Sequence, residues 1–234
     1  MPNSGDAAEG SPDHLREVRN HDSIFRVPYR RTVRVERKAQ QTRDRIERAA
    51  EQLVADGGYQ AASVSAVAAH AGVGVGTVYR QFGSKSELLA AVFRSAASRE
   101  VSAVEAALHG EDDALHQLEM AVATFTRRAL ASRWLAWALL AEPVDPTVEA
   151  ERLAFRRTYR DLFARVISQG IERGELPEQA PAICAAALVG AIAEALVGPL
   201  APTSGQLDEE HLVATLVVFC RRAVNDRETC HVDS

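Results

Sequence analysis

Four side chains that can hold a polyanion lie within nine residues of one another: Thr77, Tyr79, Arg80 and Lys85. Two of them bring hydroxyl groups and two bring positive charge. Hydroxyl, guanidinium and ammonium groups are the usual donors to DNA phosphates, and guanidinium groups also bind base edges. The spacing therefore predicts nucleic-acid recognition as the chemistry of this segment.

A short helix over about residues 75–82 must position these donors, with Val78 and Phe82 facing inward. A preceding helix begins after Ser63, a plausible N-cap, and its apolar side is formed by Val64, Val67, Ala68 and Ala71. Gly72 permits a positive-φ turn between the two helices. Two short helices joined in this way are typical of a helix-turn-helix, although a purely structural helical hairpin would share the turn. The polar outer side of the second helix favours the DNA-binding interpretation.

Helices on both sides would complete a small domain. The first begins near Lys38 or Thr42 and ends at Gly57-Gly58. Its apolar period comprises Ile46, Ala49, Ala50, Leu53 and Val54. After the pair, Ser84 and Glu87 form a capping box that opens a fourth helix, which continues to Leu108.

The remainder of the chain also has helical periodicity. Further helices are expected at about 112–131, 133–141, 146–173, 182–200 and 209–224. No strand pattern is present, so the predicted fold class is all-α. We expect a basic, disordered N-terminal arm over residues 1–37, a helix-turn-helix DNA-binding domain over 38–88, and a helical effector-binding and dimerisation domain over 89–228.

The charge is distributed unevenly along the chain. The whole protein carries a net charge of −5, but residues 16–45 contain ten basic and four acidic residues. A basic segment joined to an acidic body suggests that only the former faces a polyanion. The arm can therefore follow phosphates or enter a minor groove, or it can be a solvated tail.

The run from Arg43 to Phe93 resembles the TetR family of bacterial regulators. The matching landmarks are Arg45-Ile46, Ala49-Ala50, Gly58-Tyr59, Val67-Ala68, Ala71-Gly72-Val73, Gly76-Thr77-Val78-Tyr79, Phe82, Ser84-Lys85 and Leu88-Leu89. The resemblance implies that the helix containing Gly-Thr-x-Tyr is the recognition helix. The implied DNA contacts are Thr42, Arg43, Ser65, Val75, Gly76, Thr77, Tyr79, Arg80 and Lys85. Gly74 departs from the family pattern, which often has Ser there, and should weaken the cap of this helix.

The resemblance also implies that the later helices enclose an effector cavity and that the last two form a homodimer, through 182–200 and 209–224. Aromatic residues in three consecutive helices fit a mostly apolar small-molecule effector, although each of them alone can be a plain core residue: Phe125, Trp134, Trp137, Phe155, Tyr159 and Phe163. Candidate polar groups for the same site are Glu119, Arg128, Arg156 and Glu194, each with a surface or interface charge as the alternative, whereas His116 is expected to face solvent. Residues 182–200 are long enough to span a membrane, but Ala predominates and Glu194 interrupts them. We expect instead a buried helix that packs closely on its twin, and no membrane partner.

The sequence thus predicts a cytoplasmic, ligand-responsive transcriptional regulator, a repressor that binds a near-palindromic operator in double-stranded DNA. Two alternatives remain open: a constitutive or architectural DNA-binding protein without effector, and an enzyme on an all-α scaffold. No catalytic motif is present, and neither a cofactor nor a metal site is predicted. Cys184, Cys220 and Cys230 have no metal-ligand spacing and suit a reducing compartment.

Overall fold

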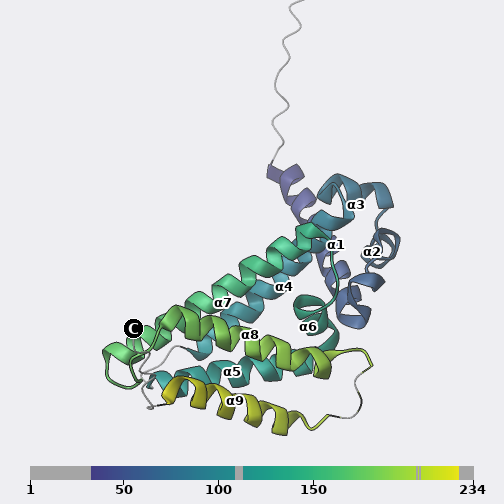
Figure 1. Cartoon of the computed structure of the whole chain (residues 1–234). Helices are drawn as coiled ribbons and strands as arrows, with labels where there is room; N and C mark the ends of the chain where they lie inside the picture. The colour runs from purple at the N-terminus through teal and green to yellow at the C-terminus, as the bar shows by residue number, and fades with distance from the viewer. Residues whose placement is uncertain (1–32, 109–112, 204, 206, 227–234) are drawn as a thin grey trace, which may run out of the picture.

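A computed structural model describes residues 33–108, 113–203, 205 and 207–226, and these residues form nine α-helices and no strand. The predicted all-α class is therefore confirmed. The helices are α1 (Val33–Ala61), α2 (Val64–Ala71), α3 (Val75–Phe82), α4 (Lys85–Ala107), α5 (Ala114–Ala131), α6 (Arg133–Leu140), α7 (Pro146–Glu172), α8 (Pro181–Leu200) and α9 (Glu209–Asn225). Helices α1–α3 form a small head, and α4 and α7 run side by side from this head into a larger helical body (Figure 1).

The first helix begins at Val33, earlier than the expected start at Lys38 or Thr42. Residues 33–37, which were assigned to the arm, are therefore helical. Residues 34–38 are exposed and mostly charged, and Arg, Glu and Lys are good helix formers even without a core contact. A search for apolar periodicity cannot detect such an extension. The rest of the predicted arm, 1–32, and its predicted disorder lie outside the described residues.

The head is held together by the apolar sides predicted for its helices. Its buried members include Ile46, Ala50, Val54, Val67, Val78, Phe82, Leu88 and Leu89. The Ser63 hydroxyl caps α2 by accepting from the Ala66 amide at 3.2 Å. Gly72 has φ 62° and ψ 42°, the left-handed conformation that the tight turn requires. Gly74, in contrast, offers α3 no side-chain cap, as its departure from the family pattern implied.

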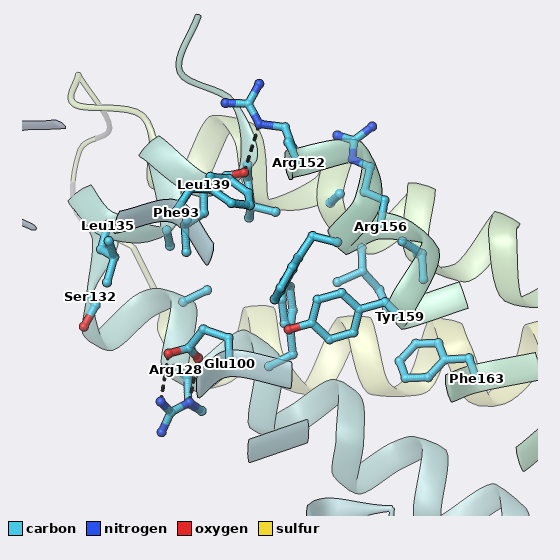
Figure 2. A pocket seen from close by; sticks show the side chains of 18 residues that line it. Phe93, Glu100, Arg128, Ser132, Leu135, Leu139, Arg152, Arg156, Tyr159 and Phe163 are labelled. Carbon is cyan, nitrogen blue, oxygen red and sulfur yellow. Dashed lines mark hydrogen bonds and ion pairs between the residues drawn. The ribbon is translucent and has the colours of Figure 1, made fainter. Parts of the chain in front are cut away.

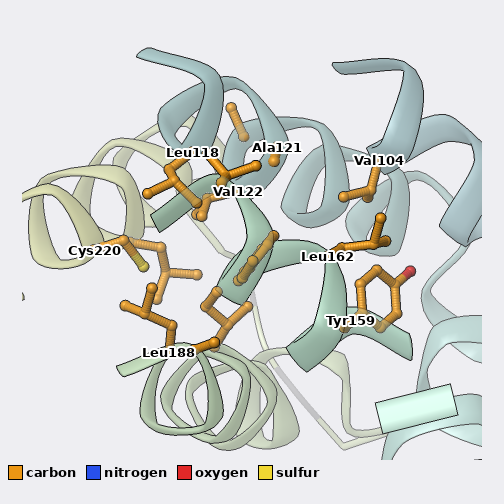
Figure 3. Packing of buried hydrophobic residues seen from close by; sticks show 14 of the residues in the cluster. Val104, Leu118, Ala121, Val122, Tyr159, Leu162, Leu188 and Cys220 are labelled. Carbon is orange, nitrogen blue, oxygen red and sulfur yellow. The ribbon is translucent and has the colours of Figure 1, made fainter. Parts of the chain in front are cut away.

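The body is a set of packed helices around one apolar core. Helix α5 lies on α9, and α7 lies on both α4 and α8. Figure 3 shows this core, in which Leu118 and Val122 of α5, Leu162 of α7, Leu188 of α8 and Cys220 of α9 converge. Beside α6, these helices surround a cavity.

Helix α8 is buried on one side only in the single chain. By length and composition it is the one described helix that meets the criteria for a membrane span, with a mean hydropathy of 2.0 over its most apolar 18 residues, but only 33% of that window is buried. One side packs on α7 through Leu188, Ile192 and Leu196, whereas Ile183 is 71% exposed. The exposed side of α8 meets no other element of the described chain, so the expected burial against a twin stays a prediction about the dimer.

Candidate nucleic-acid interface and ligand cavity

The outer side of α3 is available to a partner. Val78 and Phe82 are buried in the head, so the side chains between them turn outward. Val75 and Tyr79 are 44% and 48% exposed, and Gly76 and Arg80 are exposed as well. Thr77 is half-buried, and its hydroxyl accepts a long hydrogen bond of 3.4 Å from the Arg80 guanidinium. The Thr77 hydroxyl, the Tyr79 phenol and the Arg80 guanidinium thus lie on the outer side of α3, together with the exposed backbone at Gly76.

Lys85 extends this surface at the start of α4. The N-cap is Ser84, whose hydroxyl accepts from the Glu87 amide at 3.0 Å, as one half of the expected capping box. The Ser84 amide itself donates to the Phe82 carbonyl at 2.8 Å. Lys85 is exposed and occupies the first turn, where free amides and the positive end of the helix dipole attract an anion.

Three residues expected to support DNA binding already have partners within the head. The Arg43 guanidinium lies 4.0 Å from the centre of the Phe82 ring and donates to the Gln81 carbonyl. It therefore stabilises the C-terminal end of α3, where unpaired carbonyls favour a cation. The Thr42 hydroxyl donates to the Lys38 carbonyl at 2.9 Å, and the exposed Ser65 hydroxyl lies 3.2 Å from that of Ser63. Arg43 thus helps to position α3, and its predicted contact with DNA stays a prediction.

A buried carboxylate joins the body to the head. Glu142, which follows α6, is 6% exposed, and its Oε2 accepts from the Tyr59 amide at 2.8 Å. Gly58 makes the approach possible, because it has φ 72° and a Cβ there would lie 2.6 Å from the same oxygen. Arg152 of α7 secures the other side by donating to the carbonyls of Ala138, Leu139 and Glu142 at 2.7–3.1 Å. The end of α6 is therefore tied to both α1 and α7.

Behind this junction lies a mostly apolar cavity of about 80 Å³. Helices α4 to α8 all contribute to its wall. The aromatic lining residues are Phe93, Phe125, Phe155, Tyr159 and Phe163, and the polar ones are Glu100, Arg128, Ser132, Arg152 and Arg156. Figure 2 shows the labelled members of this set around the space. Because α4 and α6 both reach the head, a change in this wall can be transmitted to α1–α3.

Four of the six aromatic residues proposed for the effector site line the cavity: Phe125, Phe155, Tyr159 and Phe163. Trp134 and Trp137 do not. Helix α6 presents Leu135, Ala136, Leu139 and Leu140 to the cavity, and the two tryptophans lie on the other side of this helix. Trp134 is 38% exposed, and Trp137 packs against the body core.

The proposed polar groups divide in the same way. Arg128 and Arg156 line the cavity, whereas Glu119 pairs with Arg221 of α9 at 3.5 Å and Glu194 is exposed. His116 is exposed, as expected. Phe93 and Glu100 of α4 also line the cavity, although no sequence pattern marks them as effector-site residues.

The cavity contains an unusual polar group, the hydroxyl of Tyr159. This side chain is 8% exposed, and its hydroxyl has no hydrogen-bond partner among the described residues. Burial, and secondly the negative charge of Glu100, raise the pKa of Tyr159 above its ordinary value of 10.0, so the group remains protonated at neutral pH. Glu100 itself is paired with Arg128 through two hydrogen bonds of 2.6 and 2.8 Å.

The outer sides of α8 and α9 form a further surface without a partner in the described chain. Ile183, Ala187, Gly190 and Glu194 follow one another at helical spacing on α8, and all are exposed. On α9 a shallow groove is lined by His211, Ala214, Thr215, Val218, Phe219, Arg222 and Ala223. A Cβ at Gly190 would meet nothing within 4 Å in the single chain. The surface combines small side chains with exposed apolar ones, as close helix packing requires.

Comparisons with known proteins agree with this architecture. The model of bacterial regulatory proteins of the tetR family matches residues 46–92, and that of the tetracyclin repressor-like C-terminal domain matches residues 111–196. The HTH-type transcriptional regulator UidR of Escherichia coli K12 is 26% identical over 140 residues, which are 59% of this chain and 71% of UidR.

Two solved structures share the fold. The fatty acid degradation regulator FadR of Bacillus halodurans is 23% identical with a TM-score of 0.67, over 77% of this chain and 94% of that one. FadR of Bacillus subtilis, solved with stearoyl-CoA, is 19% identical with a TM-score of 0.67, over 78% and 99%. Together the two family models cover more than half of the chain. The first ends at residue 92 and the second begins at residue 111. The chain therefore belongs to the TetR family of bacterial transcriptional regulators.

Proposed function

We propose that this regulator is a repressor that binds its operator as a homodimer and is released by a small, mostly apolar effector. The observation that carries the proposal is the outer side of α3, where Tyr79 and Arg80 are exposed while Val78 and Phe82 fix the helix to the head. With Lys85 beside them, these side chains have the chemistry of a phosphate and base-edge reader. Helix α3 is the element that enters the major groove.

The cavity supports control by a ligand. It lies on the connection between the head and the body, since Phe93 belongs to the buried core of the head and also lines the cavity. A ligand that binds one arrangement of this wall better than another shifts the population of head positions. The B. subtilis FadR structure contains stearoyl-CoA. The cavity of about 80 Å³ found here is far below the roughly 300–1,000 Å³ of pockets for drug-sized ligands, so we propose a compact effector.

The outer surface of α8 and α9 supports the homodimer. A monomer that leaves Ile183 71% exposed, beside an open groove on α9, has an apolar surface that a second copy can cover. In a two-fold dimer this surface is self-complementary and spaces two copies of α3 for successive major grooves. The small residues Ala187 and Gly190 allow the two α8 helices to approach closely.

Selection of binding sites from random DNA with the full-length protein, followed by fluorescence anisotropy, tests the function. We expect an inverted repeat whose half-sites lie about one or more helical turns apart. Arg80→Ala should relax the preference at one position of each half-site. Binding without any sequence preference would refute the operator assignment and favour an architectural protein.

Gly190→Arg tests the dimer. The new side chain meets open space in the single chain, so it should preserve the helical content while producing a monomer in light scattering with much weaker operator binding. A dimer of unchanged stability would refute the proposed interface. Arg80→Ala is the matched control, because it should lose DNA selectivity and remain dimeric.

A further inference from the structure

The unpaired Tyr159 hydroxyl identifies one end of a binding site within the cavity. Figure 2 shows this hydroxyl directed into the cavity, toward the side where Glu100 and Arg128 lie. The side chain is 8% exposed and its hydroxyl has no partner among the described residues. A buried polar group without a hydrogen bond lowers stability, and buried polar groups are therefore almost always satisfied by protein, water or ligand. A ligand oxygen placed beside Tyr159 would remove this deficit.

The rest of the cavity is shaped for an aromatic ring. Phe93, Phe155, Tyr159 and Phe125 form a continuous row, with successive ring centres 5.9, 5.6 and 5.4 Å apart and interplanar angles of 89°, 78° and 77°. Such edge-to-face arrangements are the favoured geometry between aromatic rings, and an added ring can continue them. An apolar cavity of about 150 Å³ holds benzene. The cavity of about 80 Å³ found here is smaller, so the walls must move to admit a ring, and a single ring requires the least movement.

The pair formed by Glu100 and Arg128 determines which polar group fits beside Tyr159. Both carboxylate oxygens of Glu100 accept from Arg128, which neutralises the pair, but each oxygen can accept a second hydrogen bond. A ligand hydroxyl can accept from Tyr159 and donate to Glu100 at once. A ligand carboxylate can also accept from Tyr159, but it has no proton to donate to Glu100. The site therefore favours a neutral hydroxyl over an anion.

We propose that the effector class of this cavity is a single-ring phenol, whose hydroxyl binds between Tyr159 and Glu100 while its ring joins the aromatic row. This rests on the proposed function of the cavity as the effector site. Arg156, which is exposed and lies at the cavity wall, marks the side that is open to solvent. The ligand thus enters with its ring against the apolar lining and its hydroxyl inward.

Calorimetric titration of the full-length protein with phenol and with toluene, which replaces the hydroxyl by a methyl group of similar size, tests the proposal. The informative quantity is the ratio of the two affinities, compared between the wild type and Tyr159→Phe. One hydrogen bond to a buried group changes affinity by about tenfold, so the ratio should fall by about this factor in the variant. Anisole, which accepts but cannot donate, should bind the wild type less tightly than phenol, and benzoate should bind least.

Tyr59→Phe is the matched control. Tyr59 is 5% exposed and its hydroxyl also lacks a partner among the described residues, but it lies in the head and does not line the cavity. The affinity ratio should be unchanged in this variant. An equal ratio in the wild type and Tyr159→Phe, or tighter binding of benzoate than of phenol, would overturn the proposal. The titration contains no DNA, so its outcome is independent of whether the ligand releases an operator.

Discussion

Removal of the Glu142 carboxylate should loosen the head from the body. In Glu142→Ala the Tyr59 amide loses its acceptor at 2.8 Å and stays buried without a partner, because Tyr59 is 5% exposed. A hydrogen bond to a charged group in such a site contributes about 2–3 kcal/mol. For a chain of this size the expected decrease in Tm is about 4–10 °C.

Thermal unfolding followed by circular dichroism measures the global effect, and hydrogen exchange at the Tyr59 amide measures the local one. We expect exchange at this amide to accelerate more than at amides in the middle of α5, because the head should open before the body core. Glu142→Gln keeps an acceptor without the charge, so its decrease in Tm should be about half as large.

Glu149→Ala provides the control. Glu149 pairs with Arg152 at 2.6 Å, but its side chain is 41% exposed, and an exposed ion pair contributes little. This variant should change Tm by about 1 °C or less. Gly58→Ala should destabilise the wild type strongly, because its Cβ would collide with the Glu142 carboxylate, and less in the Glu142→Ala background. A decrease in Tm no larger for Glu142→Ala than for Glu149→Ala would refute the role assigned to the carboxylate.

Three further predictions concern the head and the core. Lys85→Ala should weaken binding to every DNA sequence alike and reduce the slope of log affinity against log salt by about one; an unchanged slope, measured by anisotropy, would show that Lys85 does not touch phosphate. Arg43→Ala should lower the free energy of unfolding by about 1–2 kcal/mol in denaturant unfolding, because it removes the stacking on Phe82 and the donor to the C-terminal end of α3. Arg43→Lys should restore only part of this free energy. Burial raises the pKa of Cys220 from 9.0 to about 12, so the thiol ionises first in the unfolded chain and the stability of the protein should fall as pH rises above about 9. Cys220→Ala should be less stable than the wild type at pH 8, but its stability should decrease less between pH 8 and 10.5. Equal decreases in the two proteins would contradict the assignment.

The head could be predicted almost completely from local sequence. The turn between α2 and α3 depends on Gly72, and the N-cap of α2 depends on Ser63. The inward side of α3 is marked by two residues four apart, Val78 and Phe82. Each of these signals acts within one or two helical turns. Two features of the head were not predictable in this way: the start of α1 at Val33, which no apolar period marks, and the contact of Arg43 with the Gln81 carbonyl, which joins residues 38 apart.

The body could be predicted only as a set of helices. The role of Glu142 could not be predicted, because its partner Tyr59 lies 83 residues away in the sequence. Phe93 and Glu100 of α4 could not be predicted, because α4 precedes the helices in which aromatic residues are concentrated and reaches the cavity only through the tertiary fold. The position of Trp134 and Trp137 outside the cavity was predictable in part, because Leu135 and Leu139 are four residues apart and mark the other side of the same short helix.

The row of rings that begins at Phe93 has a consequence for how this protein can acquire a new ligand specificity. Phe93 is 1% exposed within the head core, and Phe155, which it contacts, packs against the cores of both head and body. Any substitution that reshapes the cavity from this side also alters the packing on which DNA recognition depends. Val189 and Ile192 of α8 also line the cavity, but they pack only in the core of the body and do not belong to the exposed side of α8. Directed evolution of a sensor from this scaffold should therefore gain new ligands through α8 and retain Phe93 and Phe155 unchanged.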